Sequence, residues 1–452
     1  FQAEDGIRDS VASRGLGDVY KRQGLGTVGQ GVANIISQPK DRHPLVGELE
    51  LVSVAVRNLK KKRDISIPDS ILTTNPTEII NNPNIQIVVE VMGGIEPAKS
   101  LIIQAIRAGK SVVTANKAVI ARHGEEISNE AKAAGVYVLI EAAVGGGIPI
   151  IEPLKQSLGG NQITKVSGII NGTTNYILSR MDKEGVNYAE VLKDAQVLGY
   201  AESDPAADVE GSDAADKIAI LSGLAFGGAI NRANIPTTGI NLLEDIDVNY
   251  ARKLGYGIKL LAISEKGETQ SNSENSQPLS VWVEPTLVPE DNPLAGVNGV
   301  NNAILVEGNP IGQVMFFGPG AGSGPTASAV VADILNIAGI QSMSEDKIFN
   351  LDPLLSAKGW RSCHVAEKEQ ITKKNYIRLI AEDSPGVIGE IGTIFGNKKI
   401  SIESIVQFDA KDKKAEIVVI THKINQGQLE EALLDIVNLP QVKRIAAKMG
   451  CL

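Results

Sequence analysis

Residues 24–36, GLGTVGQGVANII, decide the fold of the N-terminal part of the chain. Gly24, Gly26 and Gly29 form a G-x-G-x-x-G pattern that runs directly into a helical apolar repeat. Glycines in this pattern allow a tight turn and bring the amides that open a helix close to a pyrophosphate. The pattern predicts a dinucleotide-binding turn that includes Thr27 and Val28, and a turn without a ligand is the alternative.

Strand-like and helical segments alternate behind this turn. Residues 97–109 and 124–134 have the apolar periodicity of helices. Four strand-like runs alternate with them: LELVSVAV (49–56), IQIVVEVMGG (85–94), SVVTANK (111–117) and VYVLIEAAVGGG (136–147). Alternation of this kind predicts an α/β fold with a doubly wound parallel sheet of the Rossmann type. We expect residues 24–144 to form this domain.

Two further domains are expected. Residues 145–370 mix helices and strands, which predicts an α+β catalytic and dimerisation domain. Its expected parts are a strand at 163–172, a helix at 212–227, a polar loop at 269–279 and a sheet-completing segment near 317–345. After a polar linker (366–375), residues 375–452 follow a strand–helix–strand–strand–helix–strand order. That βαββαβ order is typical of a ferredoxin-like domain.

The first 23 residues differ from the rest of the chain. FQAEDGIRDSVASRGLGDVYKRQ lacks an initial Met and any periodicity, and it resembles translated sequencing-adapter DNA. It stands where a Rossmann domain has an apolar first strand, and Lys21, Arg22 and Gln23 would cost several kcal/mol if buried there, roughly. We therefore expect this polypeptide to bind cofactor or fold poorly until an apolar strand is restored.

Composition excludes several classes of protein. A length of 452 residues suggests about three domains. The net charge of −9 and the pI near 5.2 disfavour nucleic-acid binding, which needs a positive surface. Two cysteines, Cys363 and Cys451, cannot build a disulfide framework or a four-cysteine zinc site. Without a membrane span or signal peptide in the sequence, we expect a cytoplasmic protein with no membrane partner.

A basic segment follows the strand-like run at 49–56. Arg57 is followed by Lys60, Lys61, Lys62 and Arg63, where an NAD-selective site usually carries an acidic residue. Guanidinium and ammonium groups suit a 2′-phosphate, so the segment favours NADP, with NAD possible. A solvated basic turn is the alternative.

The densest group of ionisable residues is GYAESDPAADVEGSDAADKIAIL (199–221). Its spacing does not fit a calcium loop. Asp213 and Lys217 share one helix face, which fits either a surface ion pair or an acid–base lysine beside carboxylates. Lys117 in ANKAVI (115–120) follows a strand, at the edge of the sheet where α/β enzymes bind ligands.

Taken together, GLGTVG, ANKA, EAAVGGGIPI (141–150), NGTTNYIL (171–178), the 199–221 segment and GPGAGSGPTAS (318–328) resemble homoserine dehydrogenase in the form that carries a C-terminal ACT domain. The resemblance runs from Gly24 to the C-terminus. It implies NAD(P)H-dependent reduction of L-aspartate 4-semialdehyde to L-homoserine, and the reverse, in threonine, methionine and isoleucine biosynthesis.

The resemblance also implies roles for residues. Lys217 would donate a proton to the aldehyde oxygen, Asp213 would position the substrate and hold Lys217, and Lys117 would contact substrate and cofactor. Glu202 would bind the substrate amino group, and Thr173, Tyr200 and Asp208 would line the pocket. Sodium or potassium would bind at Glu141, Val144, Gly146 and Ile148. The implied cofactor contacts are Gly24, Gly26, Thr27, Val28, Gly29, Arg57, Lys117, Gly199, Gly320 and Gly322.

The segment EDSPGVIGEIGTIFGNKKISIESIVQ (382–407) resembles an ACT domain. Such domains pair side by side and bind an amino acid, which here implies feedback inhibition by L-threonine at Asp383, Gly386 and Val387. A homodimer or homotetramer is expected from the same resemblance.

Three alternatives differ in class. An ACT-containing 2-hydroxyacid dehydrogenase would need a histidine general acid, and His123, His364 and His422 lie outside the motif-rich segments. A non-catalytic amino-acid sensor with a degenerate Rossmann half would not need the Asp213–Lys217 pair. A fused aspartate kinase would need a longer segment before Gly24.

Overall fold

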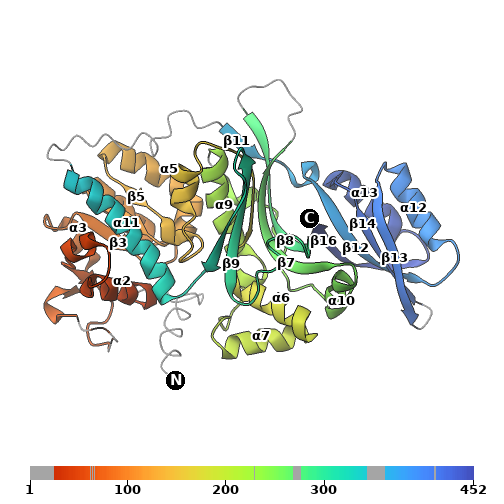
Figure 1. The fold of residues 1–452 in the computed structure, drawn as a ribbon, viewed down its shortest axis with the longest axis horizontal. Coiled ribbons are helices and arrows are strands. Elements are labelled where there is room, and N and C mark those ends of the chain that lie inside the picture. The colour runs from red at the N-terminus through yellow and green to blue at the C-terminus, as the bar shows by residue number, and fades with distance from the viewer. Residues whose placement is uncertain are drawn as a thin grey trace. The chain divides into compact units, whose positions relative to one another are not determined.

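The computed structural model describes residues 25–61, 63, 65, 67–228, 230–267, 276–343, 362–411 and 414–452 (Figure 1). Residues 1–23 and Gly24 lie outside this range, and so does the expectation about the first strand. The described residues of Phe1–Val166, Asp216–Arg232 and Asn301–Ser362 form one compact unit. The remainder, Ser167–Ala215, Ala233–Val300 and Cys363–Leu452, forms a second.

The first unit contains a Rossmann-like domain. Its parallel sheet has the order β3 (Ile87–Glu90), β4 (Ser111–Thr114), β5 (Val138–Leu139), and β1 (Val54–Ala55) pairs in parallel with β2 (Leu72–Thr73). The connecting helices are α3 (Pro76–Asn81), α4 (Ala98–Arg107) and α5 (Lys117–Ala134). Short strands joined by helices are expected for this fold.

Helices cover both faces of this sheet. On one face, α4 and α5 pack around fully buried Ile102, Ile106 and Val112. On the other, α2 (Thr27–Ser37) and α11 (Ser323–Met343) pack together with β4 and β5 around Ala327 and Val330. Figure 1 shows α11 lying beside α2 and β3 although almost 300 positions separate the two helices in the sequence. The segment near 317–345 therefore completes the helical layer, and its strand, β10 (Gly312–Pro319), pairs with β9 (Asn301–Asn309).

The second unit begins within β6 (Gln162–Ile169), whose first residues belong to the first unit. The strand order continues from β6 to the antiparallel pair β7 (Tyr256–Lys266) and β8 (Ser276–Pro289). Before the C-terminal region, the described residues of this unit include α6 (Gly172–Glu184), α7 (Tyr188–Val197), α8 (Ala206–Val209), the start of α9 (Ser212–Phe226) and α10 (Asp245–Lys253). Both α6 and α10 pack against β7.

The C-terminal region has the ferredoxin-like order expected for an ACT domain. Its core is built around fully buried Ile391, Phe395 and Leu429. The sheet order is β16, β12, β14, β13. The elements are β12 (Thr372–Glu382), α12 (Val387–Asn397), β13 (Ile402–Lys411), β14 (Lys414–Thr421), β15 (Ile424–Asn425), α13 (Gln426–Val437) and β16 (Val442–Cys451).

The last strand joins this sheet to β8. Gly450 and Cys451 of β16 pair in parallel with Thr286 and Leu287 of β8. The short strand β11 (Ser362–Val365) also pairs with β8. The ACT domain and the β7–β8 strands are therefore hydrogen-bonded parts of one unit.

Several expected boundaries are corrected by the structure. The strand-like run at 49–56 contains only the two-residue strand β1, and residues 124–134 are the second part of the longer helix α5. The expected linker 366–375 contains a 3-10 turn, Lys368–Gln370, and the start of β12. The expected loop 269–279 contains the start of β8 from Ser276, while residues 269–275 lie outside the described range. The errors at the linker and the loop come from local polarity, which did not reveal backbone pairing with distant strands.

Candidate active site

Glycine-rich segments from distant parts of the chain meet in the first unit. The Ser323 hydroxyl, at the start of α11, donates to the Thr27 carbonyl at the start of α2 (2.7 Å). A Cβ on Gly31 would lie 2.7 Å from the Ala327 Cβ, so glycine is needed for this close packing. The N-cap residue of α2 is Gly26, which has no side chain to cap the first-turn amides. These amides remain suited to an anion.

The third glycine segment is EAAVGGG (141–147). The Gly147 amide donates to the Pro319 carbonyl (3.2 Å), and a Cβ on Gly146 would lie 2.5 Å from the Gly320 carbonyl oxygen. Gly320 in turn lies against the buried Asn302 side chain, whose Oδ1 has no hydrogen-bond partner among the described residues. The structure thus brings the 141–147 and 318–322 segments together, with Gly322 in a left-handed conformation (φ +118°).

Lys117 is the first residue of α5, directly after β4. The Asn116 side chain caps this helix at Val119 and donates to the Gly94 carbonyl (2.6 Å). Thr114 donates to the buried Glu90 carboxylate (2.6 Å), and burial raises the pKa of that carboxyl. This network fixes the C-terminal edge of β3 and β4, where Lys117 begins its helix.

The Glu141 carboxylate has a structural role. It accepts hydrogen bonds from the backbone amides of Ile150 (2.6 Å), Ile151 (2.9 Å) and Glu152 (2.8 Å). The Glu141 amide donates to fully buried Asp333, and burial with the nearby Glu141 charge raises the pKa of Asp333 to about 7. Oxygens of Glu141, Glu152 and Asp333 lie within 4.8 Å of one another, but Glu152 already pairs with Lys155 (3.2 Å).

Backbone carbonyls fit a cation better than this carboxylate cluster. Gly145 and Gly146 have left-handed backbones (φ +74° and +57°) in the buried turn that includes Val144. Within the described residues, the carbonyl oxygens of Val144 and Gly146 accept no hydrogen bond. Buried carbonyl oxygens without donors suit a hard cation, so this turn passes the test of chemical fit for sodium or potassium.

A polar cluster surrounds the N-terminus of α6 in the second unit. The Asn171 amide donates to the carboxylates of Asp208 (2.8 Å) and Asp213 (3.0 Å). The Thr173 hydroxyl lies 2.6 Å from the Tyr200 carbonyl oxygen and 3.2 Å from an Asp208 oxygen. Four of the predicted substrate residues, Thr173, Tyr200, Asp208 and Asp213, are therefore brought together, and Asn171 links two of them.

Helix α9 carries both Asp213 and Lys217, one helical turn apart. Asp213 is buried and Lys217 is partly exposed. Asp216, between them, is held by Arg122 (3.0 Å) and Arg232 (2.8 Å), so its carboxylate has cationic partners of its own. Glu202 is partly exposed, and Gly199 has a left-handed backbone (φ +74°) just after α7.

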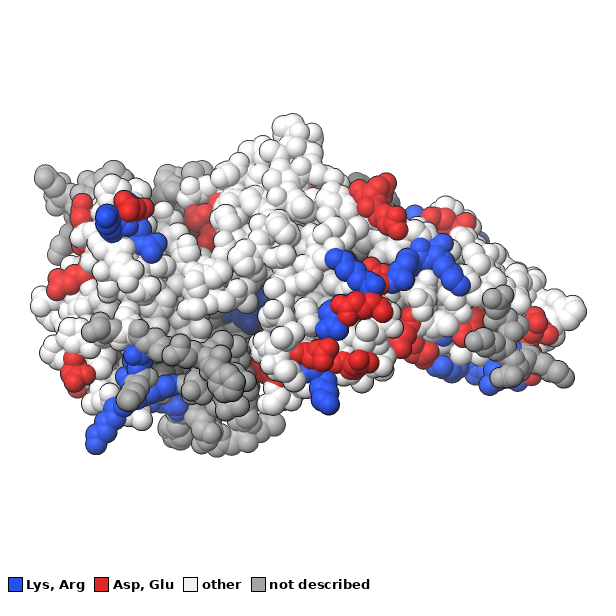
Figure 2. Space-filling view, turned by 60° about the horizontal axis from the view of Figure 1, so that its bottom comes forward, with Lys and Arg blue, Asp and Glu red and all other residues white. Residues whose placement is uncertain are grey.

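The basic turn after β1 is ordered by its own residues. Arg63 donates from its guanidinium to the carbonyls of Lys61 (2.8 Å) and Asn58 (2.9 Å). Arg57 is exposed. On the face in Figure 2, acidic and basic side chains lie intermixed.

At the ACT domain, the predicted effector turn joins β12 to α12. Gly386, the N-cap of α12, has a left-handed backbone (φ +97°), and Val387 is buried. Asp383 accepts a hydrogen bond from Gln407 of β13 (3.1 Å). The turn is therefore tied to the neighbouring strand.

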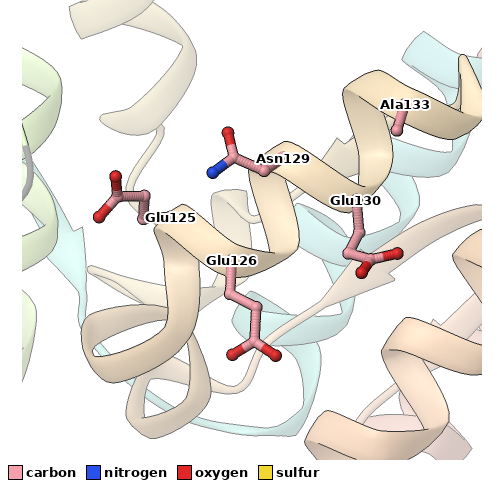
Figure 3. A pocket seen from close by; sticks show the side chains of 5 residues that line it. All are labelled: Glu125, Glu126, Asn129, Glu130 and Ala133. Atoms are coloured by element: carbon pink, nitrogen blue, oxygen red, sulfur yellow. The ribbon is translucent and has the colours of Figure 1, made fainter.

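An acidic hollow lies on α5, away from these residues (Figure 3). Glu126 pairs with Lys99 (2.8 Å) and Glu130 with Arg107 (2.6 Å). The hollow is formed by residues of one helix: Glu125, Glu126, Asn129, Glu130 and Ala133. Paired surface carboxylates are ordinary on a solvated helix face, so we assign no ligand to it.

Sequence reasoning missed the roles of two residues. Asn171 is the N-cap residue of α6, and the preference of N-caps for asparagine is enough to explain this residue from the sequence alone. Only the fold shows that its amide bridges two aspartates. Glu90 is the last residue of β3 and lies inside the strand-like run 85–94, and a carboxylate within an apolar strand was the available signal.

A Rossmann-like domain, a polar cluster with a neighbouring lysine and an ACT domain define an NAD(P)-dependent dehydrogenase with a regulatory domain. Family models match three segments: the NAD-binding domain of homoserine dehydrogenase (24–141), the homoserine dehydrogenase domain (149–335) and the ACT domain (375–441). Among the described residues, every helix is too short or too polar to cross a bilayer.

Curated and solved relatives agree with these models. The chain is 54% identical to homoserine dehydrogenase of Synechocystis sp. over 93% of its own length and 96% of that protein. The solved homoserine dehydrogenase of Thiobacillus denitrificans has 39% identity and a TM-score of 0.86, covering 95% of this chain and 96% of that one. A hyperthermophilic archaeal homoserine dehydrogenase in complex with NADPH has 29% identity and a TM-score of 0.58, covering 70% and 96%.

The chain belongs to the homoserine dehydrogenase family. It is therefore an oxidoreductase, and the 2-hydroxyacid dehydrogenase alternative is wrong. The ACT domain indicates feedback regulation.

Proposed function

We propose that the chain interconverts L-aspartate 4-semialdehyde and L-homoserine with NADP as the preferred nicotinamide cofactor. The observation that carries this proposal is the cluster at the N-terminus of α6, where Asn171 joins Asp208 and Asp213. Carboxylate oxygens gathered in this way are acceptors that suit the ammonium group of an amino-acid substrate.

Lys217 is the proposed proton donor to the aldehyde oxygen. Its position on α9, one turn after Asp213, puts an ammonium group and a carboxylate on the same helix face, an arrangement suited to an acid–base lysine. Asp213 would position both Lys217 and the substrate. When bound, the cofactor supplies the hydride; Lys217 neutralises the alkoxide by donating its proton.

The remaining substrate contacts follow from the same cluster. Glu202 and Asp208 would bind the substrate amino group, with Thr173 and Tyr200 lining the pocket. Lys117, at the C-terminal edge of β4, would contact substrate and cofactor. Lysine and threonine donors also suit the substrate carboxylate.

The converging glycine segments are the proposed cofactor site. Gly24, Gly26, Thr27, Val28 and Gly29 would hold the pyrophosphate, and Gly199, Gly320 and Gly322 would contact the nicotinamide end. Exposed Arg57 would bind the 2′-phosphate, which is the basis for NADP over NAD. The NADPH complex of the archaeal relative supports the same cofactor class.

We propose sodium or potassium at the 141–148 turn, held by backbone carbonyls of Glu141, Val144, Gly146 and Ile148. Its function would be structural, since the turn contacts the 318–322 segment. L-Threonine is the proposed effector at Asp383, Gly386 and Val387. A homodimer or homotetramer remains part of the proposal.

The test is NADP reduction with L-homoserine at alkaline pH, on this chain and on a version with an apolar first strand. Activity in either would support the reaction. Activity only in the second would assign the loss to residues 1–23. A folded protein that binds L-threonine but is inactive in both forms would favour the amino-acid sensor instead.

A further inference from the structure

Helix α10 is held at its N-terminus by a buried arginine of the ACT domain. Arg378 of β12 is 1% exposed and Asp247 of α10 is fully buried. The Arg378 guanidinium donates to Asp247 from Nε (2.7 Å) and Nη2 (3.1 Å), and to Glu244 at the helix N-cap (2.9 Å). A paired, bidentate geometry of this kind fixes both position and orientation.

The ACT domain also contacts the middle of α10. The ring of Tyr250 stacks on Phe408 of β13, with centroids 3.9 Å apart and planes 7° apart. The Lys253 ammonium lies 5.1 Å from the Phe408 ring centroid. Two ACT strands, β12 and β13, therefore contact successive turns of the helix, and β14 lies between them in the sheet.

Both strands lead to the proposed effector turn. β12 carries Arg378 and ends at Glu382, immediately before Asp383. On β13, Gln407 donates to Asp383 (3.1 Å), and its neighbour Phe408 stacks on Tyr250. On β13 the contact with the turn and the contact with α10 are made by adjacent residues, and on β12 the residue that holds α10 lies on the strand that runs into the turn.

The other side of α10 contacts the substrate-binding part of the unit. The helix packs against α6 and β7. Its Arg252 donates to Asp182 of α6 (3.1 Å). The opposite end of α6 begins with Asn171 and Thr173, which hold the carboxylates of the substrate cluster. One rigid helix thus lies between the ACT sheet and the helix that carries the site.

We propose that Arg378, although it lies in the ACT domain, is a positioning residue for the dehydrogenase site, and that α10 transmits effector binding to α6. The regulatory half of this inference rests on the proposed function of the ACT domain. Packed helices move as units, so a small shift at one face changes the contacts at the other.

The experiment compares three full-length variants with the wild type. Phe408→Leu removes the stack and keeps an apolar side chain. Arg378→Met combined with Asp247→Leu removes both members of the fully buried pair and leaves only the more exposed carboxylates of Glu244 and Glu416 without their Arg378 contact. Lys398→Met is the control, since among the described residues the ion pairs of Lys398 are with Glu431 and Asp435, both within the ACT domain. All carry the apolar first strand, and circular dichroism confirms folding.

Steady-state kinetics give KM for L-homoserine and kcat, with and without saturating L-threonine, and calorimetry gives L-threonine affinity. We expect the first two variants to bind L-threonine with the affinity of the wild type but to be inhibited by it at least about fivefold less. Their KM for L-homoserine should rise several-fold more than their kcat falls. The control should match the wild type. Full inhibition together with a wild-type KM in folded variants would overturn the proposal.

A second readout does not need the effector. By reciprocity, L-homoserine with NADP should slow hydrogen exchange in α10 and in β12 of the wild type, and less so in Phe408→Leu. If L-threonine fails to bind the wild type, the proposed effector is wrong, while this exchange pattern still decides the positioning role. Identical exchange in wild type and variant would refute it.

Discussion

Replacing Glu141 by Gln separates the structural role of this side chain from a role in cation binding. The carboxylate accepts three backbone amides, at 2.6, 2.9 and 2.8 Å. A glutamine keeps one oxygen, which can still serve Ile150 and Ile151, but its NH₂ group faces the Glu152 amide. The lost charge-assisted bond is worth about 2 kcal/mol, and the two others weaken by about 0.5–1 kcal/mol each without the charge.

A partial gain offsets this loss. Removing the Glu141 charge relieves its repulsion with Asp333, whose pKa it helps to raise. We therefore expect a net local destabilisation of about 3 kcal/mol, which corresponds to roughly 100-fold faster amide exchange. The pKa of Asp333 should fall in the variant.

Hydrogen exchange followed by mass spectrometry, on peptides covering residues 149–154, measures this directly. A single unfolding midpoint would mix several domains. Glu152→Gln is the matched control, because Glu152 pairs with Lys155 at 3.2 Å and is partly exposed, and we expect a loss below about 1 kcal/mol. Equal exchange rates in the two variants would refute the reasoning, and unchanged sodium or potassium binding in Glu141→Gln would assign the cation to the backbone carbonyls.

Three further predictions concern other parts of the structure. Burial lowers the pKa of Lys259 from 10.5 to about 8. Between these two pH values the unfolded state binds a proton that the folded state does not, so the free energy of unfolding rises with pH in that window. Lys259→Met should abolish this rise, worth about 3 kcal/mol, in urea unfolding at pH 8 to 10; an equal rise in both proteins would contradict it. Gly320→Ala would overlap the Asn302 amide and should weaken NADPH binding at least about tenfold in a fluorescence titration, and wild-type affinity would show that the loop adapts. Thr173→Val removes the hydroxyl that contacts Tyr200 and Asp208, so KM for L-homoserine should rise roughly tenfold; an unchanged KM would exclude Thr173 from substrate binding.

The sequence predicted elements well where the signal was local. The ACT order and the helix at 212–227, observed as Ser212–Phe226, follow from apolar periodicity that packing does not override. Gly145 and Gly146 belong to the expected strand-like run 136–147, but the observed strand β5 ends at Leu139 and both glycines have left-handed backbones in a turn.

Long-range partners could not be predicted. Arg378 meets Asp247, which lies 131 positions earlier, and no spacing rule connects such residues. The same holds for Gly320 against Asn302 and for the pairing of Ser276 at the start of β8, where polar residues suggested a loop. These features depend on which strands become neighbours, and this is settled only when the whole chain packs.

The pairing of β16 with β8 has a consequence for how this family member could be shortened. Gly450, Cys451 and the Leu452 amide complete hydrogen bonds to the Thr286–Leu287 stretch of β8. A chain cut before Gly450 would expose those backbone groups as an open sheet edge, which is a template for pairing with other molecules. The last strand therefore protects this edge of the sheet from pairing with other molecules. A catalytic fragment without it would need a proline or a charged residue at the exposed edge to stay monodisperse.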